Sequence, residues 1–311
     1  MDVDKVLVTG VDGLVGANVA AVLVERCEVL GIAGQAEGPE GCRMVSCDPY
    51  SADDLARAIA LESPRQIIHC GPLSRPNWDT AEIAAPDAEG EVRLATAVVS
   101  AAQRVGARSA ILLTDAVFAG PRLFHNEASP PQATTPWAEA ARAVENALID
   151  CNTLLVRTHA YGWSPSGASA NYAQHLWQRL SQGEPCEVDA ERHATPILAS
   201  DLAMLVHLAL QKKLTGLMHL TGAERTSPFR FAAELALACG FAGRHVRVAK
   251  DVAPRRPRVD ETSLNTYRAR RELETPLPLL REGLARFAEQ AENGFRDRLD
   301  PRSRLLHACA A

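Results

Sequence analysis

The sequence predicts an α/β fold, a Rossmann-type doubly wound parallel sheet with a smaller C-terminal substrate-binding lobe. Two observations lead to this prediction. Strand and helix patterns alternate regularly over the first half of the chain, and units of this kind build parallel sheets. Three glycines also stand at positions 10, 13 and 16, between the first strand and the first helix, a spacing typical of a dinucleotide-binding turn.

The first strand, 5–9, runs directly into this glycine turn. Gly10 permits a sharp turn, Gly13 lets backbone N–H groups approach a pyrophosphate, and Gly16 lets the helix lie close to the sheet. The diphosphate would lie at the positive end of the helix, so the turn needs no basic side chain. We expect the whole turn to contact the cofactor: Gly10, Val11, Asp12, Gly13, Leu14, Val15 and Gly16.

The other elements of the first half follow from apolar periodicity and capping residues. Ser51 and Asp54, for example, form a capping box where a helix begins. The helices are expected where apolar residues recur at helical spacing: 14–26, 52–62, 86–105 and 137–149. The strands are expected over short apolar runs: 28–33, 43–47, 66–70, 110–113 and 153–157.

Beyond Tyr161 the alternation ends in a loop rich in proline, serine and glycine. The helices expected after it are 171–180, 200–211 (capped by Ser200 and Asp201), 228–239 and two at the C-terminus, with a strand over 216–220. We therefore divide the chain into a dinucleotide-binding domain, 1–160, and a smaller lobe, 161–311. Segments around 190–225 are expected to return to the core of the first domain.

Composition narrows the classes of function. Net charge is −5 and no basic run is interleaved with aromatics, which argues against nucleic-acid binding. No apolar stretch is long enough to span a membrane, and the N-terminus enters a strand at once, so we expect neither a membrane segment nor a signal peptide. Eight scattered cysteines without a C-x-x-C motif indicate no metal site and fit a cytoplasmic protein.

The residues at the carboxyl ends of the predicted strands are further candidates for cofactor or substrate contacts. The second strand ends at residues 33–35 (A-G-Q), which offer no acid for the adenosine ribose. Arg43 could approach the 2′-phosphate of NADP, but it lies further along the chain. The expected cofactor is therefore NAD(P), since these residues do not choose between NAD and NADP. Gly71-Pro72 indicates backbone passing close to a ligand. Thr114 and Asp115 stand at a carboxyl end, where open α/β sheets carry their chemistry.

Several motifs together resemble the dTDP-4-dehydrorhamnose reductase family of extended short-chain dehydrogenases/reductases. They are the glycine turn, residues 69–72 (H-C-G-P), 78–82 (W-D-T-A-E), 114–120 (T-D-A-V-F-A-G), 192–196 (R-H-A-T-P), 200–203 (S-D-L-A), 262–265 (T-S-L-N) and 281–284 (R-E-G-L). The resemblance covers nearly the whole chain. It implies binding of NAD(P), with Asp48 near the adenine and Cys70, Gly71 and Pro72 lining the cofactor.

The resemblance also implies a catalytic Y-x-x-x-K pair on the helix after the fifth strand, where the tyrosine gives a proton and the lysine holds the nicotinamide ribose. No such pair exists, because the tyrosines at 50, 161, 172 and 267 are followed four residues later by Asp54, Pro165, Leu176 and Arg271. If Glu145 is aligned with the family's glutamate, Trp137 falls at the tyrosine position and Ala141 at the lysine position. A register two residues earlier gives Thr135 and Glu139.

Of the usual catalytic set only Thr114 remains. The resemblance also implies contacts to a nucleotide-sugar substrate at Tyr161, Asn171, Tyr172 and Arg192, and Thr114 and Asp115 are further candidates for substrate contact. Each has a structural alternative: Thr114 and Asp115 can bond their own turn, and Trp137 can be a packing residue at a helix start. Likewise, Arg157 is either a buried ion pair or a substrate contact, and His69 is either a core histidine or a cofactor contact. Arg255, Arg256 and Arg258 are a solvated basic loop or a diphosphate site.

Two functions follow. In the first, the chain binds NAD(P) or a nucleotide sugar but has reduced or lost reductase activity, and serves as a regulatory or scaffolding subunit with a protein partner or as a homo-oligomer. The regulatory subunit of methionine adenosyltransferase, of the same group, is a precedent. In the second, the chain is an active NAD(P)-dependent reductase or epimerase of a 4-keto nucleotide sugar. Thr114 would then polarise the carbonyl, and the proton would come from Asp115, Glu139, Tyr161 or water.

Overall fold

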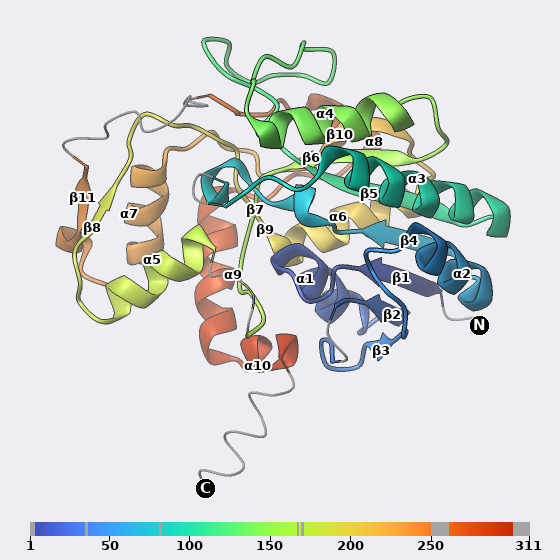
Figure 1. The fold of residues 1–311 in the computed structure, drawn as a ribbon. Helices are drawn as coiled ribbons and strands as arrows, with labels where there is room; N and C mark the ends of the chain where they lie inside the picture. Colours follow the sequence, from blue (N-terminus) through green and yellow to red (C-terminus); the bar gives the residue numbers. More distant parts are fainter. Residues whose placement is uncertain are drawn as a thin grey trace, which may run out of the picture.

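The computed structural model describes residues 4–34, 37–80, 83–166, 168, 171–249 and 261–300. Its main sheet has the strand order β10-β6-β5-β4-β1-β2-β3, and every neighbouring pair is parallel (Figure 1). The strands are β1 Lys5–Thr9, β2 Glu28–Ile32, β3 Arg43–Met44, β4 Gln66–His69, β5 Arg108–Thr114, β6 Leu154–Thr158 and β10 Gly216–His219. The predicted doubly wound parallel sheet is confirmed.

Helices cover both faces of this sheet (Figure 1). On one face lie α1 Leu14–Leu23 and α6 Ala199–Gln211, and on the other α2 Ala52–Glu62, α3 Ala88–Val105 and α4 Pro136–Leu148. Alternation along β1 divides the core, because Val6 and Val8 face α1 while Leu7 faces the opposite layer.

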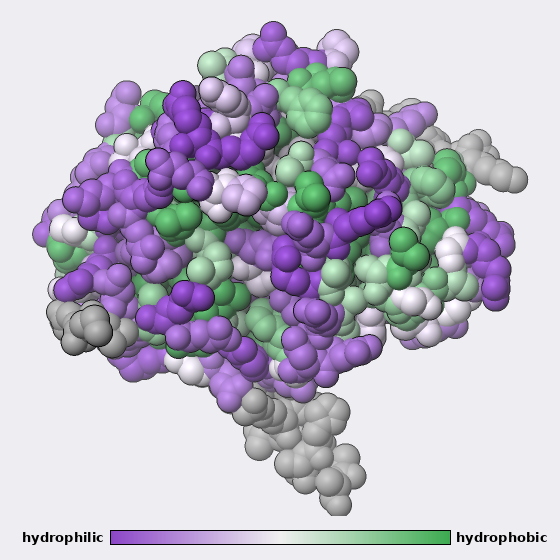
Figure 2. Space-filling model, turned by 180° about the vertical axis from the view of Figure 1, so that it is seen from behind, coloured by the Kyte–Doolittle hydropathy of each residue, from purple (hydrophilic) through white to green (hydrophobic). Residues whose placement is uncertain are grey.

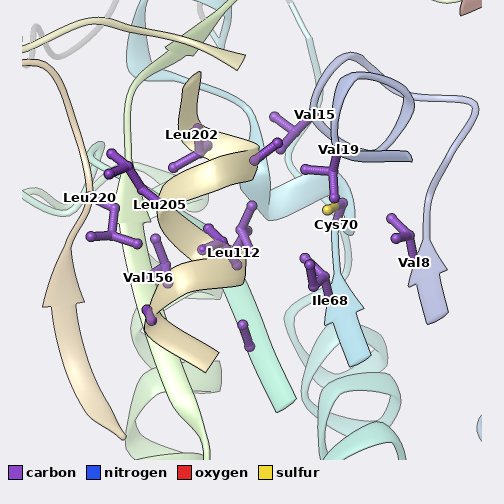
Figure 3. Close-up of a cluster of buried hydrophobic side chains, with 14 of the residues drawn as sticks. Val8, Val15, Val19, Ile68, Cys70, Leu112, Val156, Leu202, Leu205 and Leu220 are labelled. Atoms are coloured by element: carbon purple, nitrogen blue, oxygen red, sulfur yellow. The ribbon is translucent and has the colours of Figure 1, made fainter. Parts of the chain in front are cut away.

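Leu202 and Leu205 of α6 pack over Leu112 and Val156 of the sheet (Figure 3). Full burial of such side chains contributes about 1.5–3 kcal/mol each to folding. Both layers are therefore anchored by apolar contact, which holds the carboxyl ends of the strands in place.

The second half of the chain adds a lobe beside the sheet, at the left of Figure 1. It contains α5 Tyr172–Ser181, α7 Pro228–Ala238, α9 Leu280–Glu292, α10 Phe295–Leu299 and the parallel pair β8 Cys186–Val188 and β11 Val246–Val248. A second short pair joins β7 Ala160–Tyr161 to β9 Ile197–Leu198, and α8 Tyr267–Leu273 lies near β10. Segments far apart in sequence thus meet here.

Two expectations for this half differ from the structure. Ser200 and Asp201 do not cap α6, whose N-cap is Leu198 without a side-chain hydrogen bond. Asp201 instead accepts a hydrogen bond from Arg286 of α9 at 2.7 Å, because an ion pair across the lobe is available to it. Between residues 261 and 300, three helices are present rather than the two expected. The basic residues Arg255, Arg256 and Arg258 lie outside the described residues.

Hydrophilic side chains cover most of the face shown in Figure 2, with hydrophobic ones scattered among them. Within the described part of the chain, no helix is both long and apolar enough to cross a bilayer. The cysteines described there carry no disulfide, and no group of three or more His, Cys, Asp or Glu side chains in those ranges is placed to hold a metal ion.

Candidate functional site

A cleft of about 430 Å³ lies at the carboxyl ends of the sheet strands. Its lining comes from the turn between β1 and α1, the segments after β2, β3 and β4, the start of α3, the first turn of α4 and the residues just before α5. The segment after β4 includes two 3₁₀ turns, η1 Pro72–Ser74 and η2 Asn77–Asp79. The cleft therefore occupies the edge at which open α/β sheets bind ligands.

The glycine turn is built for close backbone packing. Gly10 has φ +67°, and a Cβ placed on it would stand 2.1 Å from the carbonyl oxygen of Cys70. A Cβ on Gly16 would stand 2.1 Å from the carbonyl oxygen of Gly10. Gly13 differs, because a Cβ there would meet only the Gly10 carbonyl oxygen, at 3.4 Å. Gly10 and Gly16 thus shape the turn, while Gly13 leaves room above it.

Most residues of this turn line the cleft: Gly10, Asp12, Gly13, Leu14 and Val15 do, whereas Val11 and Gly16 are buried beneath it. Gly13 is the N-cap of α1, and no side chain caps this N-terminus. The first-turn N–H groups of a helix have no partner inside the helix, and they attract anions. The geometry therefore fits the diphosphate of a dinucleotide, with an open space over Gly13 in which to lie.

At one end of the cleft the residues fit a nucleoside. The Asp12 carboxylate accepts a hydrogen bond from the Gly34 N–H at 3.1 Å, and the Tyr50 hydroxyl lies close to Gly34. Asp48, predicted near the adenine, is exposed and accepts from the Tyr50 N–H at 2.9 Å, so it shapes the loop from outside the cleft lining. Arg43 is paired with Glu62 at 2.6 Å, which occupies its guanidinium.

In the middle of the cleft lie residues 69–72, which include the predicted Cys70, Gly71 and Pro72. His69 is buried and its Nδ1 lies 2.8 Å from the Thr9 hydroxyl. Burial lowers the pKa of His69 to about 4, so the ring is neutral at physiological pH. Burial also raises the pKa of the Cys70 thiol, which makes it a poor nucleophile.

Glu91 was missed by the sequence reasoning. It lies in the first turn of α3, only 8% exposed, and lines the cleft. Burial raises the pKa of its carboxyl to about 7, and the nearby charge of Asp87 adds to the shift. In sequence Glu91 looks like an ordinary first-turn acid of an amphipathic helix, so no local signal separates it from Glu89 beside it.

Trp137 forms the other end of the cleft. Thr135 caps α4 through its hydroxyl, which accepts from the Ala138 N–H at 3.2 Å, and Pro136 occupies the first turn. The indole N–H of Trp137 donates to the carbonyl oxygen of Ile83 at 3.1 Å. Ala141 follows one turn later and is fully buried.

The alternative alignment places Thr135 and Glu139 at the tyrosine and lysine positions. Thr135 is a helix cap and Glu139 is exposed. Among the described residues that line the cleft, the single tyrosine is Tyr50, at the Gly34 end, and none is lysine. Neither register therefore brings a tyrosine hydroxyl and a lysine amine together here.

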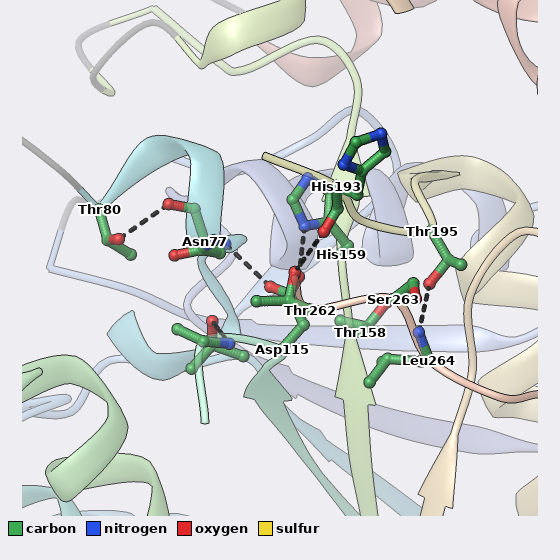
Figure 4. Close-up of polar contacts among 12 residues, drawn as sticks. Asn77, Thr80, Asp115, Thr158, His159, His193, Thr195, Thr262, Ser263 and Leu264 are labelled. Carbon is green, nitrogen blue, oxygen red and sulfur yellow. Dashed lines mark hydrogen bonds and ion pairs between the residues drawn. The ribbon is translucent and has the colours of Figure 1, made fainter. Parts of the chain in front are cut away.

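Thr114 and Asp115 lie outside the lining of the cleft. Thr114 is fully buried, and its hydroxyl accepts from the Ala116 N–H at 3.1 Å. Asp115 is also fully buried and joins three segments, as Figure 4 shows. Its carboxylate accepts from the Asn77 N–H at 2.9 Å and from the Thr262 hydroxyl at 2.5 Å, and it lies 2.7 Å from the His159 ring.

Of the four predicted substrate contacts of the lobe, Tyr161, Asn171 and Tyr172 line one small cavity, and Arg192 lies outside its lining. Asn171 lines the cleft, but its side chain caps α5 and donates to the Gly162 carbonyl at 2.8 Å. The Tyr161 hydroxyl points at Gly283 of α9, and burial raises its pKa well above the usual value. Arg192 lies 3.3 Å from Asp189 and outside the described cleft lining.

Arg157 is the buried ion pair that the structural reading expects. Its guanidinium donates two hydrogen bonds to the carboxylate of Glu145, at 2.6 and 2.7 Å, and both side chains are buried. Such a two-pronged pair between β6 and α4 is a structural element, and it leaves the Arg157 guanidinium unavailable to a ligand.

The family model described as RmlD substrate binding domain matches residues 4–293. The chain belongs to this family. This match confirms the resemblance to the dTDP-4-dehydrorhamnose reductases over nearly the whole length of the chain. No curated protein sequence matches it.

Solved structures share the fold at low sequence identity. A hypothetical dTDP-4-dehydrorhamnose reductase from Sulfolobus tokodaii is 22% identical, with a TM-score of 0.72 over 88% of this chain and 96% of that one. The dTDP-4-dehydrorhamnose reductase from Bacillus anthracis, solved in complex with NADP, is 20% identical, with a TM-score of 0.75 over 93% and 100%. The UDP-glucose 4-epimerase from Thermotoga maritima, solved with UDP-glucose, is 17% identical, with a TM-score of 0.74 over 94% and 99%.

Proposed function

We propose that this RmlD-family chain binds NAD(P) or a nucleotide sugar in the cleft and has reduced or lost reductase activity. It would then serve as a regulatory or scaffolding subunit that acts on a protein partner or on a second copy of itself. The observation that carries the proposal is the position of Trp137. An indole whose N–H is already bonded to Ile83 stands at the end of the cleft, where the resemblance implies a tyrosine hydroxyl.

Nucleotide binding is supported by the glycine turn. The uncapped N-terminus of α1 offers backbone donors to a diphosphate, and the space over Gly13 admits it. Tyr50 and Gly34 offer a surface for the nucleoside at one end. The Bacillus anthracis relative of the same fold was solved with NADP, and the Thermotoga maritima relative with UDP-glucose. When bound, NAD(P)H would supply a hydride.

Loss of activity is supported by the absence of a tyrosine–lysine pair from the described lining of the cleft, and by the positions of the side chains expected as substitute proton donors. An indole N–H is not acidic near neutral pH, and loss of a positioned general acid typically costs about 10²–10⁴ in rate. Asp115 has both oxygens engaged by protein groups. Tyr161 is buried with a pKa far above neutrality, and Glu139 is exposed on the helix surface. None of the three lines the cleft.

Two measurements test the proposal. NADPH and NADH fluorescence titrations should show saturable binding by the wild-type protein and none by Gly13→Val, whose side chain would fill the space over the turn. NADPH oxidation with a dTDP-4-keto sugar should be at least about 10²-fold slower than in ordinary reductases. Turnover at ordinary reductase rates would instead support an active reductase or epimerase. Absence of binding to NAD(P)H and to nucleotide sugars would overturn the proposal.

A gain-of-function variant tests the same point from the other side. Trp137→Tyr combined with Ala141→Lys should raise turnover above the wild-type level if the missing pair is the defect. Because Ala141 is fully buried, thermal stability must be measured on the same sample. A folded double variant that binds NADPH but gains no turnover would show that the defect lies elsewhere.

A further inference from the structure

Glu91 is a buried acid whose carboxylate has no hydrogen-bond donor or cation among the described residues. Its side chain reaches the middle of the cleft, where Oε2 lies 3.2 Å from the point that a Cβ on Gly71 would occupy. The absence of that Cβ leaves the carboxylate open to the cleft. A buried carboxylate of this kind is costly unless something donates to it.

The groups around Glu91 do not neutralise it. His69, at the end of β4, points its Nε2 at the same spot beside Gly71, 3.0 Å from the missing Cβ, but the ring is neutral above about pH 4. Asp87, on the same helix, adds a negative charge. From α4 the cleft receives the apolar ring of Trp137.

Two more charged groups, Arg75 and Asp79, line the cleft from the segment after β4. Neither contributes to the shift in the pKa of Glu91, and the two interact with each other. The deficit of donors at Glu91 must therefore be met by water or by a ligand.

A vicinal diol is the ligand group that meets this deficit. An ionised carboxylate has two oxygens and accepts several hydrogen bonds, while two adjacent hydroxyls offer two donors side by side. Donors to the ionised form lower a carboxyl pKa, so such a ligand would expel the proton that burial keeps on Glu91 near pH 7. Every ligand class in the proposed function carries such a diol, in a ribose or in a sugar ring.

We propose that Glu91 binds a vicinal diol of the ligand beyond its diphosphate, either the second ribose of a dinucleotide or the hexose of a nucleotide sugar. The inference rests on the proposed function, because it assumes a nucleotide in this cleft. It predicts that binding releases a proton. The affinity for such ligands therefore rises with pH, by about tenfold between pH 6 and pH 8 for a carboxyl that titrates near 7.

The test uses calorimetric titration of the full-length protein at pH 6 and pH 8. The variant is Glu91→Gln, which keeps the size of the side chain but cannot ionise, and the control is Glu89→Gln, an exposed acid in the same helical turn. The probes are ADP-ribose and NADH, with ADP as their truncated form, and UDP-glucose, with UDP as its truncated form. Thermal unfolding of each variant shows that it is folded.

We expect Glu91→Gln to bind the longer probes about tenfold more weakly than wild type at pH 8 and with no pH dependence, while ADP and UDP are unaffected. Glu89→Gln should match wild type. An effect on ADP-ribose and NADH identifies the ribose, and an effect on UDP-glucose identifies the hexose.

Three results would overturn the inference. They are wild-type affinity in Glu91→Gln at both pH values, affinity that falls as pH rises, and equal effects on ADP and ADP-ribose. In each of these the wild type still binds a nucleotide, so the proposed function stands. If the wild type binds none of the probes, the proposed function fails and the inference fails with it.

Discussion

The Nδ1 atom of His159 lies 2.7 Å from Oδ2 of Asp115, and neither side chain is exposed to solvent. The same Oδ2 accepts the hydroxyl of Thr262, a residue 147 positions further along the chain. Asp115 thus ties the end of β5 to the end of β6 and to the C-terminal segment (Figure 4). Asp115, which the sequence suggested as a candidate for substrate contact, therefore connects three parts of the fold through buried hydrogen bonds.

Asp115→Ala should therefore destabilise the protein by about 3 kcal/mol, because it leaves Asn77, His159 and Thr262 without their buried acceptor. Urea denaturation at pH 7 measures the change. Asp150→Ala, at an exposed position, is the control and should cost less than about 0.5 kcal/mol. A cost below 1 kcal/mol for Asp115→Ala would contradict this role.

Glu145→Ala should cost about 3–5 kcal/mol, because it leaves the guanidinium of Arg157 buried and uncompensated. The double variant Glu145→Leu/Arg157→Met should recover part of that loss, since no buried charge remains. Equilibrium unfolding of the two variants, with the exposed Glu139→Ala as control, provides the comparison. Equal loss in the single and double variants would mean that packing, rather than the unpaired charge, sets the cost.

Stability should also depend on the titration of Glu91. Its pKa is about 7 in the folded protein and about 4.5 in the unfolded chain, so the folded state holds the proton more tightly. The stabilisation is fully present below pH 4.5 and is lost as pH rises through 7.

Between pH 6 and pH 8 the wild-type protein should lose about 1 kcal/mol of unfolding free energy relative to Glu91→Gln. Denaturant midpoints of the two proteins across this range, without ligand, measure the effect. Parallel curves would show that Glu91 titrates as an ordinary surface acid.

Substitutions of Gly10 and Gly13, two of the three glycines of the turn, should have different effects. Gly10→Ala places a side chain at φ +67° and a Cβ 2.1 Å from the Cys70 carbonyl oxygen, so it should destabilise the fold by about 3 kcal/mol. Gly13→Ala meets only a 3.4 Å contact and should stay within about 1 kcal/mol of wild type, while it weakens nucleotide binding. Thermal unfolding and NADH titration of both variants separate the effects. Equal stability loss in the two would contradict the distinction.

The sequence by itself determined the sheet, the glycine turn and the family. These features depend on residues that are close together along the chain. Examples are the apolar run before Gly10, the Ser51 side chain that accepts a hydrogen bond from the Asp54 N–H, and the side chains of β1 that alternate between the two faces of the sheet. Local geometry and periodicity of this kind act over a few residues, so they can be read without knowing what packs where. The lack of a Y-x-x-x-K pair was equally visible, since it is a fact of sequence.

Only the tertiary structure decided which polar groups meet. It placed Thr114 under its own turn, bound Asp115 to His159 and Thr262, and left Glu91 open to the cleft beside Gly71. The position of Asp115 depends on partners 44 and 147 residues away, and that of Glu91 on its burial beside Gly71. The desolvation of a carboxyl and the supply of donors to it are properties of the packed site, and no local pattern along the chain encodes them.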